Sequence, residues 1–262
     1  MEERSVIKVG GDLEKAINGD YKIDVKSVLT EAWESTKRSR TAINIGLLFV
    51  FILGVTISLV VSQYFGGIEV VLQNQQQSAL LNIIVTLVVY PFLVGVEMMG
   101  IYHAIGLKTH PKLVFGFLKR GSWVAICALF TSTIIALGMA LYYLPGIYLA
   151  VALSLVLPLV VEKRLSPMKA ILISLKATRH QWFAIFSIYL VLMLLLVASF
   201  LPLVIFAKSS ISLVGGIMTI FALTYLAPLF YNVKGVLYRE IFGMQVTLQK
   251  GSDSPVDSTF SA

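Results

Sequence analysis

Long apolar runs separated by short polar segments dominate the pattern along this chain. The runs cover residues 42–64, 79–103, 123–143, 146–161, 183–206 and 211–233. Although the fourth is short, each approaches the length that a helix needs to cross a hydrocarbon core roughly 30 Å thick. Backbone groups inside a bilayer must be satisfied within the chain, so the runs should be helices. The pattern predicts an all-α integral membrane protein with six transmembrane helices.

Shorter amphipathic segments precede the first, third and fifth runs. Their apolar residues recur at the helical spacing of three and four positions. These residues are Val25, Val28, Leu29, Ala32 and Trp33, then Leu113, Val114, Phe117 and Leu118, then Met168, Ile171, Leu172 and Leu175. Basic residues on the polar faces indicate helices that lie on the cytoplasmic leaflet. We expect three hairpins, each preceded by an interfacial helix, reflecting either an internal repeat or the shared demands of membrane hairpins.

A proline lies in the second run of each expected hairpin, at Pro91, Pro158 and Pro228. A proline inside a helix removes one donor and clashes with the carbonyl four residues earlier, so it kinks the helix. The kinks are either fixed features that shape the bundle or, as in some transporters, hinges beside a substrate site. Their recurrence at corresponding places favours the structural interpretation.

Small residues at intervals of four predict close packing of the third and fourth runs. The first ladder is Ala128, Ser132, Ala136 and Ala140, and the second is Gly146, Ala150 and Ser154. Small side chains let the backbones of membrane helices approach closely. The tight turn at 143–146 would bring the ladders together, so we expect this hairpin at the centre of the bundle.

Composition and charge agree with a membrane protein. Hydrophobic residues make up 57% and charged residues 13% of the chain, whereas soluble domains have about 45–50% and about 25%. The net charge is +7. If the six runs span the membrane, the loops alternate between its two sides, and all basic residues except Lys208 lie on the same side. By the positive-inside rule both termini are cytoplasmic. We expect anionic lipids of the cytoplasmic leaflet as partners, and no nucleic acid.

The two ends of the chain differ from its centre in composition. Residues 1–23 are polar, mixed in charge and unlike a secretory signal, so we expect a cytoplasmic N-terminal tail. Residues 24–240 should form the six-helix membrane domain. Residues 241–262 should form a cytoplasmic C-terminal tail that is partly disordered, because its last residues are small and polar.

Glu97 is the one acidic residue well inside an apolar run. The polar residues within roughly 80° of it on the helical wheel are Asn82, Thr86 and Tyr90. An ionisable group inside a bilayer is costly, so this polar stripe is a candidate proton-linked or lipid-headgroup site. Alternatively, Glu97 reaches the cytoplasmic headgroups or pairs with Arg164 or Lys234, each six residues after a proline. The structural alternative is the favoured one.

Other residue types with chemical potential form no convincing constellation. His103 and His110 flank a loop without a nearby cysteine or carboxylate, so we expect no metal site. Cys127 is the single cysteine, and we interpret it as a packing residue. Motifs for hydrolases, zinc proteases, phosphate loops and dinucleotide binding are missing from the sequence. We therefore expect neither a cofactor nor an enzymatic activity.

Amides and aromatic residues suggest further structural roles. Interhelical hydrogen bonds are expected of Asn44, Asn82 and Asn232. Aromatic belts mark membrane interfaces. The outer belt would be Tyr142, Tyr143 and Tyr148, and the inner belt Trp33, Trp123 and Trp182.

Residues 144–192 contain a motif of proline, tyrosine, serine and tryptophan at set intervals. Its members are Pro145, Tyr148, Leu149, Pro158, Ser166, Pro167, Ala170, Ile171, Ser174, Trp182, Ile185 and Phe186. With this motif, the stretch resembles a group of uncharacterised bacterial inner-membrane proteins. These proteins are similar to the membrane domain that is fused to some glycerophosphodiester phosphodiesterases. The resemblance implies a helical bundle in the bacterial cytoplasmic (inner) membrane. It implies no hydrolysis, because the catalytic barrel is absent from the chain.

Two hypotheses about function remain. The leading one is a non-enzymatic membrane protein acting as a scaffold, an accessory subunit or a lipid-associated factor, with a membrane protein or a second copy as its partner. The rival is a small transporter or lipid translocator whose path is lined by the stripe centred on Glu97.

Overall fold

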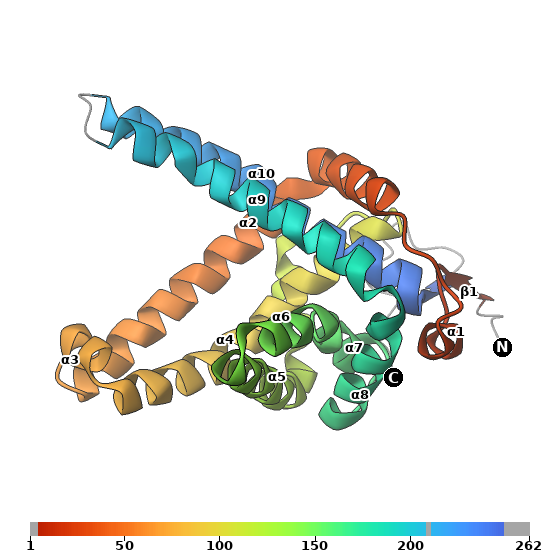
Figure 1. Ribbon diagram of the computed structural model, residues 1–262, viewed down its shortest axis with the longest axis horizontal. Helices are drawn as coiled ribbons and strands as arrows, with labels where there is room; N and C mark the ends of the chain where they lie inside the picture. The colour runs from red at the N-terminus through yellow and green to blue at the C-terminus, as the bar shows by residue number, and fades with distance from the viewer. Residues whose placement is uncertain (1–4, 208–210, 249–262) are drawn as a thin grey trace. The chain divides into compact units, whose positions relative to one another are not determined.

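The computed structural model describes residues 5–207 and 211–248, and it is almost entirely helical (Figure 1). The elements up to the fifth helix are β1 (Ser5–Val9), α1 (Leu13–Asn18), α2 (Val25–Tyr64), α3 (Ile68–Gln73), α4 (Gln75–Ala104), the 3₁₀ helices η1 (Pro111–Phe115) and η2 (Leu118–Arg120), and α5 (Gly121–Leu141). The later elements are α6 (Tyr143–Ala152), α7 (Val156–Glu162), α8 (Pro167–Thr178), η3 (Arg179–Gln181), α9 (Trp182–Phe206), α10 (Ser212–Phe242) and β2 (Met244–Leu248). Six helical stretches among the described residues are long and apolar enough to cross a membrane, as the hydrophobic pattern predicts.

The chain folds into two compact units that are interleaved in sequence. Unit 1 consists of Met1–Thr41, Met99–Thr109 and Lys176–Ala262. Unit 2 consists of Ala42–Met98 and His110–Leu175. The helices α2, α4 and α8 each contribute to both units.

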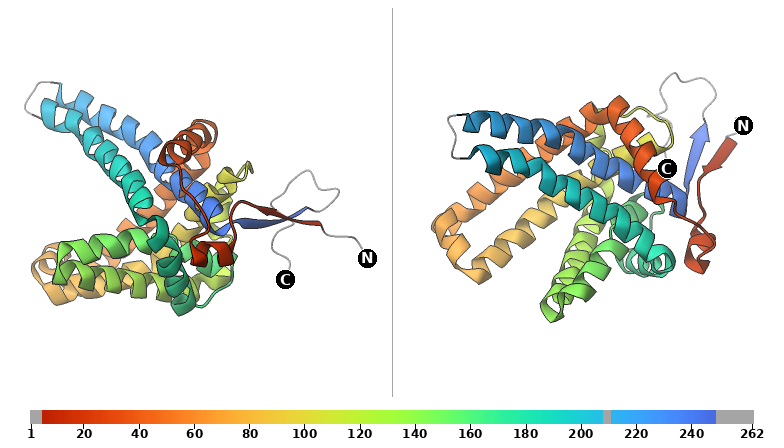
Figure 2. Two further views of the ribbon diagram at one scale, coloured as in Figure 1. Left: turned by 45° about the vertical axis from the view of Figure 1, so that its right-hand side comes forward. Right: turned by 45° about the horizontal axis from the view of Figure 1, so that its top comes forward.

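The N-terminal residues belong to the folded part of unit 1. Strand β1 pairs antiparallel with β2, from Ser5 opposite Leu248 to Val9 opposite Met244, and Figure 2 shows the two strands side by side. Residues 5–18 of the expected cytoplasmic N-terminal tail at 1–23 therefore carry secondary structure, a strand and a short helix, and the side of the membrane on which they lie stays a prediction. The described chain is not purely α-helical either, since it contains this small sheet.

The C-terminal boundary also differs from the expectation at 240. Helix α10 continues to Phe242, and the strand β2 follows directly after Gly243. The rest of the expected C-terminal tail, 249–262, lies outside the described residues, as does Lys208.

Local contacts fix the segment between β1 and α2 within unit 1. The side chain of Asp12 caps α1, since its Oδ1 accepts from the backbone N–H of Glu14 at 3.0 Å. Gly19 ends the helix at a φ of 85°, a left-handed conformation that glycine adopts without strain. The hydroxyl of Tyr21 then donates to the carbonyl of Ala177 at 2.7 Å. The segment is thus attached to the end of α8.

Glycines allow two helices of unit 1 to cross at very short range. A Cβ added to Gly100 on α4 would collide with the carbonyl oxygen of Tyr231 on α10. A Cβ added to Gly235 on α10 would collide with the carbonyl of Gly100. Only glycine permits such a backbone approach, so the crossing depends on both residues.

The helices α9 and α10 lie side by side in unit 1, and they can be followed as the cyan and blue helices of Figure 1. Gly215 on α10 faces the carbonyl of Pro202 on α9, 2.6 Å from where its Cβ would lie. Pro202 and Pro228 both lie inside their helices. The sequence analysis selected only the second of these two prolines.

Unit 2 contains the apolar parts of α2 and α4, which α3 connects at one end (Figure 1). The rings of Phe49, Phe92 and Phe115 form an edge-to-face cluster with centroids 5.1–5.8 Å apart. Such aromatic clusters bury large apolar areas and fix the relative angle of their helices. The cluster therefore joins α2, α4 and η1.

The fourth apolar run is two helices, not one. Helix α6 ends at Ala152 and α7 begins at Val156. The carbonyl of Ala152 accepts from Ser174 Oγ on α8 at 2.6 Å, which satisfies one of the acceptors exposed at the helix end. Pro158 lies in the first turn of α7, where a missing N–H costs little. The predicted kink at Pro158 is thus corrected to a break, whereas Pro91 lies inside α4.

The three amphipathic segments adopt three different structures. The first is the start of α2, and Ser39 interrupts it with non-helical angles of φ −134° and ψ 17°. The second forms the short helices η1 and η2 instead of one amphipathic helix, with a break between them at 116–117. The third is α8, which buries Ala170 and Ser174 and exposes Met168 and Leu172. Ile171 is also buried, so α8 packs one face on the protein and exposes Met168 and Leu172 on the other.

Candidate functional site

The predicted polar stripe on α4 is only partly assembled. Glu97 and Thr86 are buried, Tyr90 is half-buried and Asn82 is exposed. Thr86 Oγ1 donates to Asn82 Oδ1 at 3.2 Å along the same helix, so Asn82 is not shown in the interhelical role predicted for it. Glu97 lies within electrostatic reach of Tyr90 and of Cys127 on α5.

The two cations proposed as partners of Glu97 have different environments. Arg164 is exposed between α7 and α8 with a positive φ of 52°. Lys234 is buried on α10. The burial of Lys234 in unit 1 favours a structural charge, since buried charges require compensation.

The small-residue ladder on α5 is not its packing face. Ala128 is buried, but the remaining three members, Ser132, Ala136 and Ala140, are exposed. The close approach to α6 is made by Gly138, whose added Cβ would lie 3.0 Å from Gly146 Cα. The predicted ladder is therefore wrong on the α5 side, because the contact face lies two residues from it. On the second ladder Gly146 is buried, and Ala150 and Ser154 are half-buried.

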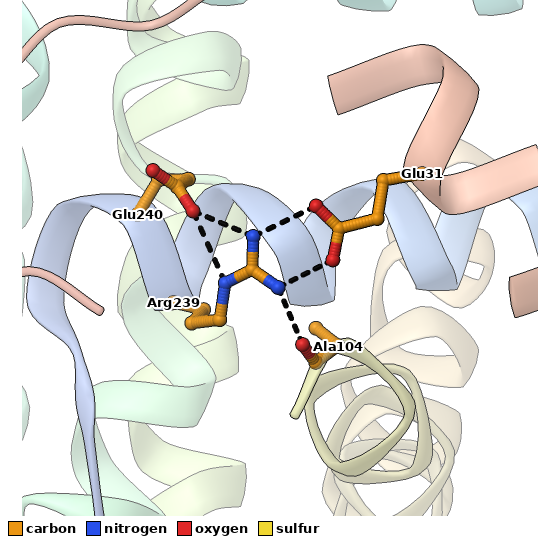
Figure 3. Close-up of polar contacts among 4 residues, drawn as sticks. All are labelled: Glu31, Ala104, Arg239 and Glu240. Carbon is orange, nitrogen blue, oxygen red and sulfur yellow. Dashed lines mark hydrogen bonds and ion pairs between the residues drawn. The ribbon is translucent and has the colours of Figure 1, made fainter. Parts of the chain in front are cut away.

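A cluster of polar contacts surrounds Arg239 in unit 1 (Figure 3). Its Nη1 donates to Glu31 Oε1 and to the carbonyl of Ala104, and its Nη2 donates to Glu31 Oε2 at 2.8 Å. Nη2 and Nε both donate to Glu240 Oε1, at 2.6 and 3.1 Å. Every nitrogen of this guanidinium is thus engaged, and the pairing with Glu31 is the bidentate form that arginine favours.

These contacts connect three helices at their ends. Ala104 is the last residue of α4, so its carbonyl is one of the acceptors that a helix end leaves unsatisfied. A cation at that place also interacts favourably with the helix dipole. Arg239 therefore caps α4 while it connects α10 to Glu31 on α2.

The backbone of Arg239 connects the same cluster to the N-terminal segment. Its carbonyl accepts from the N–H of Gly11 at 2.8 Å and from the N–H of Gly243 at 3.0 Å. A Cβ on Gly10, Gly11 or Gly243 would collide with this region of the backbone. Three glycines thus permit the segment after β1 to approach the end of α10 at Arg239.

A second buried network lies in unit 1 around His103. Its Nδ1 is 2.9 Å from Asn232 Oδ1, and its Nε2 is 2.7 Å from Thr109 Oγ1. Asn232 Nδ2 donates to Thr36 Oγ1 at 2.9 Å. The prediction of an interhelical role for Asn232 is confirmed, because it joins α10 to α2 and to α4.

The hydrogen bonds assign one tautomer to His103. The hydroxyl of Thr36 donates to the carbonyl of Ala32 at 2.8 Å, so it accepts from the amide nitrogen of Asn232. The amide oxygen of Asn232 then faces His103, whose Nδ1 must carry the proton. Thr109 donates to the unprotonated Nε2. This chain of donors and acceptors satisfies the imidazole on both sides.

The aromatic residues have mixed surroundings. Trp33, Trp123, Tyr142 and Tyr143 are all exposed, at 40%, 50%, 78% and 80%. Trp182 instead stacks on Phe186 at 4.9 Å. The residues that the structure describes contain no group of three or more histidine, cysteine, aspartate or glutamate side chains that could hold a metal ion.

The Arg239 cluster was not predicted from the sequence. Arg239 was counted only for its charge, and Glu31 lies among the polar residues of an amphipathic segment. The pairing joins residues separated by 208 positions, which no local pattern reveals. No family model, curated protein or solved structure matches this chain.

Proposed function

We propose that this protein is a non-enzymatic integral membrane protein that serves as a scaffold, an accessory subunit or a lipid-associated factor. The observation that supports this role is the use of buried and half-buried polar groups in unit 1. Arg239, Glu31, His103 and Asn232 are engaged with one another, with helix ends or with neighbouring hydroxyls. Polar groups that hold a fold together in this way are not thereby arranged for chemistry on a substrate.

The role also draws on the amphipathic segments. Met168 and Leu172 on α8, and Phe115 and Leu118 around η1 and η2, expose large apolar side chains beside basic residues. This combination suits segments that lie at the surface of a bilayer. We infer interfacial segments before each of three helix pairs, in a bacterial cytoplasmic membrane with both termini on the cytoplasmic side.

A partner search tests the proposal. Tagged full-length protein is extracted in native lipid nanodiscs, and co-purifying proteins and lipids are identified by mass spectrometry. A membrane protein recovered in fixed ratio, or a second copy of this chain, supports the scaffold or accessory role. Recovery of neither, together with uptake of a soluble substrate by proteoliposomes of the pure protein, contradicts it.

A second candidate function is a small transporter or lipid translocator centred on Glu97. The observation that favours it is the burial of an acidic side chain, 5% exposed, within an apolar helix. Replacing Glu97 with Gln removes the charge and keeps the shape. Transport should then be lost while the protein remains folded, and Glu69→Gln, an exposed acid on α3, is the matched control. Unchanged transport in Glu97→Gln excludes this second function.

A further inference from the structure

We propose that Arg40, together with Tyr225, forms a binding site for the phosphate of an anionic phospholipid. The site deepens the lipid-associated branch of the proposed function. It lies entirely within unit 1, where α2 and α10 supply its residues.

The guanidinium of Arg40 lies over an aromatic ring. Its Cζ lies 3.9 Å from the ring centroid of Tyr225, within the range of a cation–π interaction. Tyr225 also contacts Trp33 and Phe221, with ring centroids 6.0 and 5.4 Å apart. The aromatic neighbours therefore position the arginine before any ligand binds.

The donors of Arg40 are available for a ligand. Stacking uses the face of the guanidinium, whereas its N–H groups point outward in the plane. The side chain of Arg40 makes no hydrogen bond and no ion pair with the residues that the structure describes. Its neighbours differ, since Lys37 pairs with Glu34 at 2.6 Å and Arg38 Nε donates to the carbonyl of Glu34. A planar fork of unused donors matches the oxygens of a phosphate.

The surroundings favour a lipid over a soluble phosphate. Ser39 bends α2 directly before Arg40, and the apolar run begins at residue 42. From Tyr225, exposed apolar residues follow α10 at intervals of four, three and four, namely Phe221, Met218 and Val214. This stripe provides an apolar surface for an acyl chain beside a phosphate held at Arg40.

Lipid titration tests the site. Full-length protein in an uncharged detergent is titrated with phosphatidylglycerol, and lipid-bound species are counted by native mass spectrometry. Arg40→Gln should weaken binding about tenfold, as expected for loss of a charge-assisted hydrogen bond. Arg38→Gln removes the same charge two residues away and should change binding by about twofold or less. Equal losses in both variants, or no loss in Arg40→Gln, overturn the proposal.

Further variants separate the effect of the aromatic ring from that of the charge. Competing ligands distinguish a lipid phosphate from free phosphate. Tyr225→Phe keeps the ring and should bind normally, whereas Tyr225→Leu should bind more weakly although all cations remain. Inorganic phosphate should not displace phosphatidylglycerol, and phosphatidylcholine should bind more weakly because its ammonium group opposes the arginine. Displacement by inorganic phosphate, or tighter binding of phosphatidylcholine, refutes an anionic-lipid site. These readouts do not require a protein partner, so they fail or succeed independently of the accessory role.

Discussion

The guanidinium of Arg239 donates to both carboxylate oxygens of Glu31, which lies 208 residues earlier in the chain. The same side chain caps the end of α4 at Ala104, and its backbone carbonyl receives Gly11 and Gly243. One residue near the end of α10 thus joins α2, the end of α4 and the segments that follow β1 and precede β2.

Arg239→Lys should destabilise unit 1, because an ammonium cannot form the bidentate pair and cap Ala104 at once. Breaking a fully buried pair costs about 3–5 kcal/mol, and we expect about 2 kcal/mol here because Glu31 and Glu240 are 36% and 40% exposed. Thermal unfolding in nanodiscs measures the change. Lys37→Gln removes an exposed pair and should cost less than about 1 kcal/mol. Equal stability of both variants would contradict the role of Arg239.

Gly235→Ala should force α10 away from α4, because the new methyl group would collide with the carbonyl of Gly100. Overpacking of this kind typically costs about 1–3 kcal/mol. Gly216→Ala in the same helix meets nothing within 4 Å and should stabilise the helix by about 0.5–1 kcal/mol. Unfolding temperatures of the two variants should therefore move in opposite directions. A shift in the same direction is incompatible with the close crossing.

Gly146→Ala should destabilise unit 2 by about 1–3 kcal/mol, because its Cβ would lie 2.6 Å from the backbone nitrogen of Met139. Ala136→Leu, on the exposed side of α5, should change stability by less than about 0.5 kcal/mol. Denaturant titrations of both variants in one detergent provide the comparison. A larger loss of stability in Ala136→Leu than in Gly146→Ala would instead support the packing face predicted from the sequence.

Tyr21 should make the attachment of the N-terminal segment sensitive to alkaline pH. Burial raises the pKa of Tyr21 from 10.0 to about 12 in the folded protein. The unfolded state therefore loses this proton first, so the stabilisation is complete below about pH 10 and declines as pH rises toward 12. Tyr21→Phe should lack this decline, although it also loses the hydrogen bond to Ala177. The rate of limited proteolysis at residues 10–24, followed across this pH range, measures the loss of attachment. Identical pH profiles of the proteolysis rate for Tyr21→Phe and the unchanged protein would rule out the role of Tyr21.

The sequence predicted those features that depend on local composition. Long apolar runs identified the spans, because a bilayer imposes length and low charge on each helix separately. The role of Asn232 followed from the cost of an amide in an apolar helix. Contacts between distant residues were not predictable, since nothing near Glu31 or Arg239 signals the other. The four-residue spacing of small side chains also predicted the wrong packing face of α5. Alanine and serine can face either lipid or protein, whereas Gly138 lies where the backbone of α6 approaches closely.

The sidedness of the loops is the most direct test, because the proposed membrane role predicts six spans with both termini on the cytoplasmic side. Single cysteines are placed at Gln73, Tyr143, Lys108 and Lys169 in a Cys127→Ala background and probed with a membrane-impermeant maleimide. We predict that intact cells label only the positions at Gln73 and Tyr143, and that the other two react only after permeabilisation. Labelling of Lys108→Cys in intact cells, or protection of Gln73→Cys, would contradict the account.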